Sequence, residues 1–125
     1  MAEPRPVILF VDDDEDYREA IRAILESSGY EMIGASSAEE GIRRFRERPA
    51  DLVLVDMMME EVDSGTTFVK ELKALGEEVP IYLLSSVGET LSVTTDTTAL
   101  GLAGIFQKPI DASTLVNVLR SRLGS

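Results

Sequence analysis

Two short apolar runs that each lead into carboxylates constrain the fold of this chain most strongly. Residues 7–11 are followed by Asp12 and Asp13. Residues 52–55 are followed by Asp56. Continuous apolar runs of this length are typical of strands buried on both faces in the middle of a parallel sheet, where functional groups lie beyond the carboxyl ends of the strands. The carboxylates are therefore expected at a functional edge, although a turn or a helix cap would also explain Asp56 taken alone.

The rest of the sequence alternates between strand-like and helix-like patterns. Expected strands lie at residues 7–11, 30–35, 51–56, 80–84 and 103–107, and expected helices at residues 17–28, 36–48, 64–75, 89–100 and 111–123. The helix at residues 89–100 has the weakest support, because threonine is a poor helix former. Strands that alternate with helices through short connections predict one α/β domain with a doubly wound parallel sheet covered on both faces.

Under this architecture, several polar side chains meet at one edge of the sheet. They follow the ends of four strands and are Asp12, Asp13, Asp56, Ser85 and Lys108. Two neighbouring carboxylates raise each other's pKa unless a cation offsets their repulsion. Three carboxylates, one hydroxyl and one ammonium together form a pocket suited to a hard cation such as Mg²⁺, which prefers oxygen ligands.

Composition excludes several other functions. The chain has 12 Lys and Arg residues against 23 Asp and Glu residues, giving a net charge of −11. Such a surface repels nucleic-acid phosphates and anionic membranes, so direct nucleic-acid binding is not expected. Cysteine and histidine are absent, which removes disulfides, thiol and imidazole catalysis and the usual zinc sites. No apolar stretch is long enough to span a membrane and the first residues lack a signal-peptide pattern, so a cytoplasmic location is expected.

The order of these polar residues resembles that of receiver domains in two-component response regulators, from about residue 7 to the last helix. The shared features are Asp12 and Asp13 after the first strand, Asp56 after the third, Ser85 after the fourth and Lys108 with Pro109 after the fifth. Each feature alone is weak evidence. Five of them in the right order, each at a strand end, make the resemblance specific.

The resemblance implies the flavodoxin-like fold of the CheY-like superfamily, with strand order 2-1-3-4-5. It implies that Asp56 accepts a phosphoryl group from a histidine kinase or a histidine phosphotransfer protein. The implied Mg²⁺ ligands are the side chains of Asp12, Asp13 and Asp56 and the backbone carbonyl of Met58. Ser85 and Lys108 would contact the phosphoryl oxygens, and the family's peptide bond after this lysine is typically cis.

The sequence departs from the family pattern in the loop after Asp56, at Ile105, and in the threonine-rich helix expected at residues 89–100, which carries an apparent extra residue. Residues 59–65 lack the usual proline, and one residue is inserted in the loop after Asp56. Ile105 occupies the position where the family usually has an aromatic residue, and strand alternation directs Phe106 to the other face. Ile105 cannot report phosphorylation by moving a ring, so these departures argue against the usual output surface.

The expected function is that of a single receiver domain over residues 1–125, either complete or the N-terminal part of a longer regulator. Phosphorylation would switch an output partner or effector domain that the sequence does not identify. No enzyme activity is expected beyond Mg²⁺-dependent self-phosphorylation and self-dephosphorylation. Dephosphorylation should be slow, because Met58 and Val87 stand where the family orients water and neither forms the necessary hydrogen bonds.

Two other functional classes remain open at this point. A Mg²⁺-dependent phosphohydrolase of the haloacid-dehalogenase type also uses an aspartate at a strand end, and Asp12 to Asp14 supply its Asp-x-Asp pattern. However, Asp16 stands where that family has Thr or Val, and no acidic pair follows Lys108 at a strand end. A flavin-binding domain would need hydroxyls and free N–H groups after the first strand, and this loop is acidic.

Overall fold

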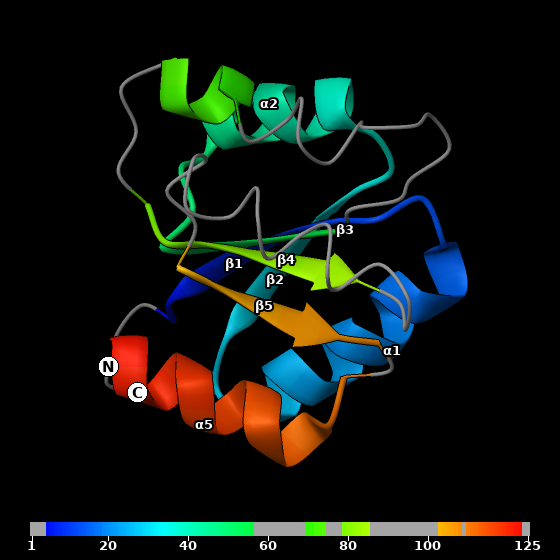
Figure 1. Cartoon of the computed structure of the whole chain (residues 1–125), viewed down its shortest axis with the longest axis vertical. Helices are drawn as coiled ribbons and strands as arrows, with labels where there is room; N and C mark the ends of the chain where they lie inside the picture. Colours follow the sequence, from blue (N-terminus) through cyan, green and yellow to red (C-terminus); the bar gives the residue numbers. More distant parts are fainter. Residues whose placement is uncertain (1–4, 57–69, 75–78, 86–102, 109, 124–125) are drawn as a thin grey trace.

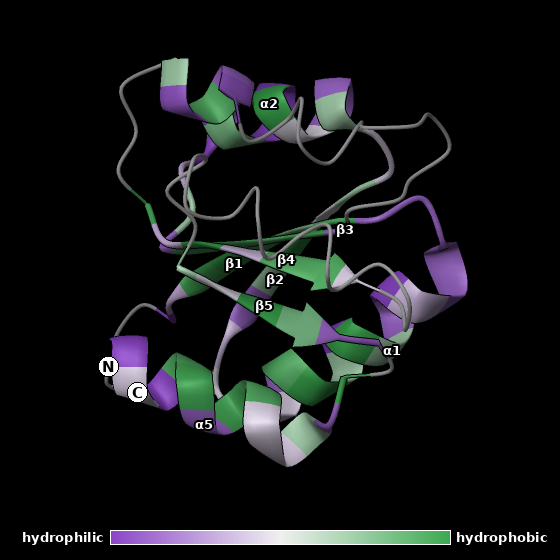
Figure 2. Ribbon diagram, in the orientation of Figure 1, coloured by the Kyte–Doolittle hydropathy of each residue, from purple (hydrophilic) through white to green (hydrophobic). Residues whose placement is uncertain are grey.

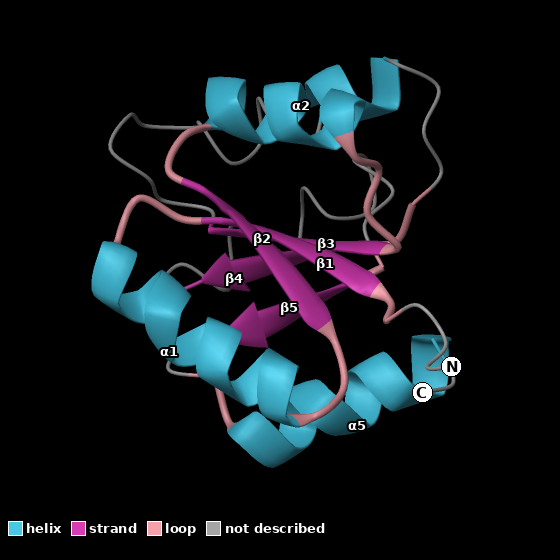
Figure 3. Cartoon of the chain, turned by 180° about the vertical axis from the view of Figure 1, so that it is seen from behind, coloured by secondary structure: helices cyan, strands magenta, loops and turns pink. Residues whose placement is uncertain are grey.

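The computed structural model describes residues 5–56, 70–74, 79–85, 103–108 and 110–123 of the 125-residue chain. Its elements are β1 (Val7–Val11), α1 (Glu15–Ser27), β2 (Glu31–Ala35), α2 (Ala38–Glu47), β3 (Leu52–Asp56), β4 (Ile81–Ser85), β5 (Gly104–Gln107) and α5 (Ala112–Leu123). Residues 70–74 are also helical. Figure 1 shows α2 on one face of the sheet and α1 beside α5 on the other, and Figure 3 shows the same layers from behind.

The five strands form one parallel sheet in the order β2-β1-β3-β4-β5. This confirms the predicted fold class and strand order, with β2 and β5 at the edges. The register pairs Val11 with Val55, so Asp12 follows β1 at the level where Asp56 ends β3. All five carboxyl ends therefore face one edge of the sheet, as the sequence predicts.

The sheet separates two apolar clusters, and its strands are the most hydrophobic part of the described chain (Figure 2). Alternate residues of the central strands contribute to opposite clusters, as the two-residue period of a strand requires. Leu9 and Val53 pack toward α2 and the helical residue Leu72. Phe10 and Leu54 pack toward α1 and α5. Burial on both faces explains why these strands read as continuous apolar runs.

Local sequence signals explain where the first helix begins and ends. Asp14 caps α1, and its carboxylate accepts a hydrogen bond from the backbone N–H of Tyr17 at 3.2 Å. Ile21 and Leu25 bury one face of this helix. The chain then turns at Gly29, whose φ of 95° is a conformation that glycine adopts more readily than other residues.

The start of α2 is fixed by a reciprocal pair of side-chain hydrogen bonds. The Ser37 hydroxyl accepts from the backbone N–H of Glu40 at 3.1 Å. The Glu40 carboxylate accepts in turn from the Ser36 N–H at 2.6 Å and from the Ser36 hydroxyl at 2.9 Å. These contacts hold the pKa of Glu40 below its usual value, mainly through the Ser36 N–H. Such mutual capping satisfies donors that a helix start leaves unpaired.

The helices within the described residues agree with the sequence expectations, and one further expected helix cannot be compared. α1, α2 and α5 match three of the predicted helices. Residues 70–74 lie inside a fourth, the helix predicted at residues 64–75. Leu72 is fully buried in this helical segment. The helix expected at residues 89–100 lies outside the described residues.

The outer edge of β2 carries an acceptor that is already occupied. The Glu31 N–H and the Ala35 carbonyl bond to the β1 side, so Met32 and Gly34 direct their backbone groups away from the sheet. Arg22 of α1 donates from Nη1 to the Met32 carbonyl at 2.9 Å. A guanidinium therefore covers part of an edge that would otherwise be open.

Candidate functional site

Three carboxylates meet at the carboxyl edge of the sheet. Asp12 and Asp13 follow β1, and Asp56 is the last residue of β3. One oxygen from each of these carboxylates lies within 4.8 Å of the others. Asp12 and Asp56 are buried, whereas Asp13 is exposed to solvent. The cluster therefore has a fixed inner part and one ligand open to water.

The backbone and a nearby amide hold Asp12 in place. Its N–H donates to the Ala35 carbonyl at 3.0 Å, which extends the β1–β2 pairing by one residue. Its Oδ1 accepts from the Asp14 N–H at 2.9 Å, in the turn that leads into α1. The Asp12 carbonyl accepts from Nη1 of Arg18. Oδ2 is thereby directed toward the interior of the site.

Lys108 bridges the two buried carboxylates. Its ammonium nitrogen lies 3.1 Å from Oδ2 of Asp12 and 3.2 Å from Oδ1 of Asp56. Burial lowers the pKa of Lys108, but the hydrogen bonds and charges of Asp12 and Asp56 together outweigh it and raise the pKa above its usual value. Lys108 is therefore protonated at neutral pH and offsets part of the negative charge of the cluster.

Ser85 ends β4 at the same edge of the sheet. Its backbone carbonyl accepts from the Lys108 N–H at 2.8 Å, which joins the ends of β4 and β5. Its hydroxyl oxygen is buried and has no hydrogen-bond partner within the described part of the chain. A buried hydroxyl normally has a partner, so this donor suits a ligand that enters the site.

The donor set fits a hard divalent cation. Carboxylate oxygens are the ligands that Mg²⁺ prefers, and an open side leaves room for the waters that it keeps. Asp12, Asp13 and Asp56 offer such oxygens close together, and their combined negative charge exceeds the one positive charge of Lys108. The geometry therefore suits a cation next to Asp56.

The structure brings together most, but not all, of the residues predicted for the site. Asp12, Asp13, Asp56 and Lys108 lie together, and Ser85 lies at the same edge. The predictions for Met58, Val87, Pro109 with its expected cis bond, and the loop at residues 59–65 fall outside the described residues.

Ile105 and Phe106 are consecutive residues of β5 and point to opposite faces of the sheet, as predicted. Ile105 packs against the cluster that contains Val55. Phe106 packs against the opposite cluster, with its ring centroid 5.2 Å from that of Tyr82. Within the described part of β5, the aromatic ring is therefore on the α5 side and is not available on the Ile105 side.

Tyr17 is a neighbour of the site that the sequence analysis did not single out. Its ring centroid lies 4.8 Å from the Lys108 ammonium nitrogen, and its hydroxyl accepts from the Ile110 N–H at 3.1 Å. Tyrosine at a position that otherwise suits Leu or Ile is a weak signal in the sequence. The contact joins segments 93 residues apart, which no local pattern reveals.

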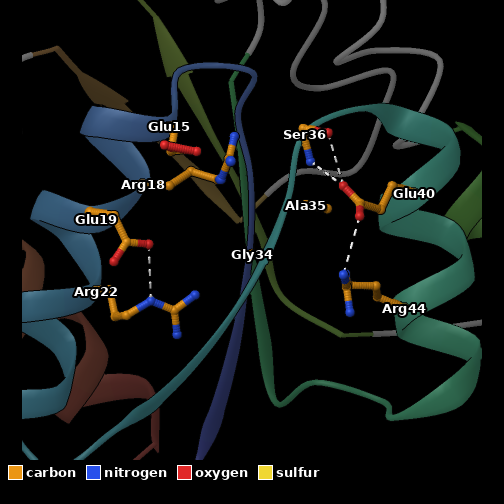
Figure 4. A pocket seen from close by; sticks show the side chains of 9 residues that line it. All are labelled: Glu15, Arg18, Glu19, Arg22, Gly34, Ala35, Ser36, Glu40 and Arg44. Carbon is orange, nitrogen blue, oxygen red and sulfur yellow. Dashed lines mark hydrogen bonds and ion pairs between the residues drawn. The ribbon is translucent and has the colours of Figure 1, made fainter.

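A second pocket lies along the outer edge of β2, between α1 and α2 (Figure 4). Its volume is about 580 Å³, and it is lined by Glu15, Arg18, Glu19, Arg22, Gly34, Ala35, Ser36, Glu40 and Arg44. Several of its charges pair within the wall, including Arg22 with Glu19 at 3.3 Å and Arg44 with Glu40 at 3.2 Å. The lining has three Glu and three Arg residues and is therefore balanced in charge, unlike the acidic cluster.

Comparisons with known proteins agree with this geometry. A family model described as the response regulator receiver domain matches residues 8–120. The transcriptional regulatory protein ZraR of Escherichia coli O157:H7 is 36% identical over 118 residues, which cover 93% of this chain and 26% of that protein. The chemotaxis protein CheY of Bacillus subtilis is 30% identical over 117 residues, which cover 93% of this chain and 96% of that protein.

Solved structures of response regulators share the fold of this chain. CheY4 of Vibrio cholerae superposes with a TM-score of 0.87 at 25% identity, covering 96% of this chain and 100% of that one. A receiver domain protein from Clostridium thermocellum superposes with a TM-score of 0.85 at 27% identity, covering 95% of this chain and 94% of that one. The chain thus spans about a quarter of the length of ZraR and nearly the whole length of CheY. Among the described residues, no helix has the length and apolar character that a membrane span requires.

Proposed function

This chain belongs to the response regulator receiver domain family, and on that basis we propose that Asp56 is its phosphoacceptor. The observation that carries the proposal is the ammonium of Lys108, which joins Asp56 to Asp12 beside Asp13 at the carboxyl edge of the sheet. The family match decides against the phosphohydrolase alternative. Receiver domains act in signalling by phosphorylation, and this chain is one of them.

The proposed reaction is transfer of a phosphoryl group to a carboxylate oxygen of Asp56. The oxygen forms a bond to phosphorus while the bond from phosphorus to the donor atom breaks, and the electron pair of that bond leaves with the donor. The donor atom is a histidine nitrogen in a kinase or phosphotransfer protein, or an oxygen in acetyl phosphate. Such transfers depend mainly on positioning and on neutralising charge, which fits a site built from fixed carboxylates and an ammonium.

Three side chains are proposed to hold Mg²⁺, those of Asp12, Asp13 and Asp56. The burial of Asp12 and Asp56, together with the exposure of Asp13, supports a site in which two ligands are fixed and water completes the shell. The Met58 carbonyl is added as a fourth ligand on the basis of family resemblance. Bound Mg²⁺ would supply positive charge to the phosphoryl oxygens.

Lys108 and Ser85 are proposed to contact the transferred group. An ammonium has only donors and a hydroxyl has one, so both groups can bind phosphoryl oxygens. Lys108 already lies 3.2 Å from an Asp56 oxygen, and Ser85 has a buried hydroxyl without a partner within the described residues. Lys108 and Ser85 therefore each carry a donor that could bind a phosphoryl oxygen.

The partners follow from the family rather than from a surface seen on this chain. We propose a histidine kinase or a histidine phosphotransfer protein as the donor and an output partner or effector domain as the target. Residues 1–125 are proposed to form a single receiver domain, alone or within a longer regulator. The net charge of −11 supports the absence of direct nucleic-acid binding. Restriction of catalysis to self-phosphorylation and self-dephosphorylation, and the cytoplasmic location, stay predictions.

Intact-mass measurement with acetyl phosphate and Mg²⁺ tests the assignment. The wild type should gain one phosphoryl group, and Asp56→Asn should gain none. Asp111→Asn is a matched control, because Asp111 caps α5 and takes no part in the acidic cluster. Equal modification of Asp56→Asn and wild type would remove Asp56 from the proposal, and repeated turnover of a generic phosphate ester would contradict the absence of hydrolase activity.

A further inference from the structure

Tyr17 contacts the segment that carries Lys108 in two ways. Its ring lies beneath the Lys108 ammonium, with 4.8 Å between the nitrogen and the ring centroid. Its hydroxyl accepts a hydrogen bond from the backbone N–H of Ile110 at 3.1 Å. One side chain therefore touches both the charged end of Lys108 and the backbone two residues further along.

This hydroxyl and the Ser85 carbonyl both anchor the backbone of the segment, among the residues that the structure describes. The N–H of Lys108 donates to the Ser85 carbonyl at 2.8 Å, and the N–H of Ile110 donates to Tyr17. Each of these bonds restrains the backbone at the residue that donates it. The side chain of Lys108 consequently leaves the backbone in a set direction, toward Asp12 and Asp56.

The ring that contacts the ammonium is itself held in place. The Tyr17 N–H donates to the capping carboxylate of Asp14, and the Tyr17 ring meets that of Phe10 edge to face at 6.0 Å between centroids. Phe10 is fully buried in β1. A ring fixed by the core can stabilise a cation above it, because the face of an aromatic ring is electron-rich.

We infer that Tyr17 is a positioning residue for Lys108, its hydroxyl fixing the backbone and its ring holding the ammonium over the phosphoacceptor. The inference rests on the proposed function, in which Lys108 contacts the phosphoryl group. It adds a residue that neither binds the metal nor touches the phosphoryl group. Tyr17 sets the fraction of time that the Lys108 ammonium spends beside Asp56.

Two variants separate the two contacts. Tyr17→Phe keeps the ring and removes the hydroxyl, whereas Tyr17→Leu removes both. Tyr82→Phe is a matched control: the Tyr82 hydroxyl accepts from Arg122 at 2.8 Å, and the Arg122 guanidinium lies 5.8 Å from the Tyr82 ring centroid. This control loses a similar hydroxyl contact beside a similar cation, away from Lys108.

The first measurement needs neither metal nor phosphate. Nuclear magnetic resonance of the metal-free protein should show the Lys108 side-chain methylene protons shifted upfield by the Tyr17 ring. Tyr17→Leu should abolish this shift, Tyr17→Phe should retain it while the Ile110 N–H exchanges faster with solvent, and Tyr82→Phe should change neither signal. An unchanged Lys108 shift in Tyr17→Leu would overturn the inference.

The second measurement is the rate of phosphorylation by acetyl phosphate at saturating Mg²⁺. Tyr17→Leu should slow it by about two- to fivefold, the range expected for loss of an exposed cation–π contact. Tyr17→Phe should recover part of the rate, and Mg²⁺ affinity should stay at the wild-type value in both variants. A wild-type rate in Tyr17→Leu would refute the positioning role. If the wild type itself takes up no phosphoryl group, the proposed function fails, while the Lys108 shift still decides whether Tyr17 holds the ammonium.

Discussion

Replacing Lys108 by alanine would expose the electrostatic balance of the acidic cluster. The ammonium lies 3.1 Å from Asp12 and 3.2 Å from Asp56, and both carboxylates are buried. Removing one partner of a buried ion pair costs about 3–5 kcal/mol. Lys108 is 23% exposed and Asp13 is open to water, so solvent should screen part of the remaining charge. We expect Lys108→Ala to lower the free energy of unfolding by roughly 2–3 kcal/mol in the absence of metal.

Mg²⁺ should raise the free energy of unfolding of Lys108→Ala by about as much as the substitution lowers it in the absence of metal. Lys108→Ala removes a cation that competes for Asp12 and Asp56, so the variant should bind Mg²⁺ at least as tightly as the wild type. A ligand at a hundredfold excess over its Kd stabilises the folded state by about 2.7 kcal/mol, which is comparable to the expected loss. Urea unfolding in EDTA and in increasing Mg²⁺ measures both effects, with Lys70→Ala as an exposed-lysine control. Equal stability of wild type and Lys108→Ala in EDTA, or a large loss of Mg²⁺ affinity in the variant, would refute the reasoning.

The pH dependence of this difference has a definite sign. The pKa of Lys108 is raised in the folded protein, so its stabilising contribution is complete below the unfolded value of about 10.5. That contribution is lost as pH rises through the folded pKa. The stability difference between wild type and Lys108→Ala should therefore not decline through titration of the lysine between pH 7 and 9. A decline in the Lys108 contribution within that window would contradict the raised pKa.

Three further predictions concern other residues. Glu40→Ala should lower the free energy of unfolding by about 1–2 kcal/mol, and the control Glu39→Ala, in the same helical turn, should lower it by less. Because the pKa of Glu40 is lowered in the folded protein, urea unfolding should show the effect of Glu40→Ala in full above pH 4.5. The effect should be lost at lower pH. A Cβ at Gly104 would lie 2.8 Å from a tyrosine ring, so Gly104→Ala should cost about 1–3 kcal/mol in thermal unfolding, whereas Gly34→Ala, with its nearest contacts at 3.4 Å, should change little. Met58→Asn should lose phosphate faster than the wild type, because asparagine can orient water; equal rates would exclude shielding by Met58.

The sequence predicts the sheet well because its strands carry strong and unambiguous signals. Residues 7–11 and 52–55 are apolar throughout, as is typical of strands that a parallel sheet buries on both faces. The cap of α1 at Asp14 is also local, because a side chain three residues before a backbone N–H fixes the start of a helix. Such signals act over a few residues and are visible without a structure.

The site is only partly predictable, because some of its contacts join residues that are far apart in the sequence. Its carboxylates and Lys108 follow from the rule that parallel strands end at one edge. The fact that Lys108 bridges Asp12 and Asp56 depends on side-chain geometry between segments far apart in the chain. The contact of Tyr17 with Lys108 was not predicted at all, because helical spacing explains the tyrosine equally well as an apolar residue.

The guanidinium of Arg22 on the outer carbonyl of Met32 bears on how this protein behaves when it is crowded. An exposed edge strand is a template on which another chain can add a strand, and continued addition leads to fibrils. A strand from another molecule that adds to β2 would need the Met32 carbonyl as an acceptor and would have to displace Arg22 from it. Arg22 is also paired with Glu19 and Glu26 of its own helix. The cost of breaking these contacts falls on the first step of assembly, so this edge of the sheet favours solitary molecules over ordered aggregates.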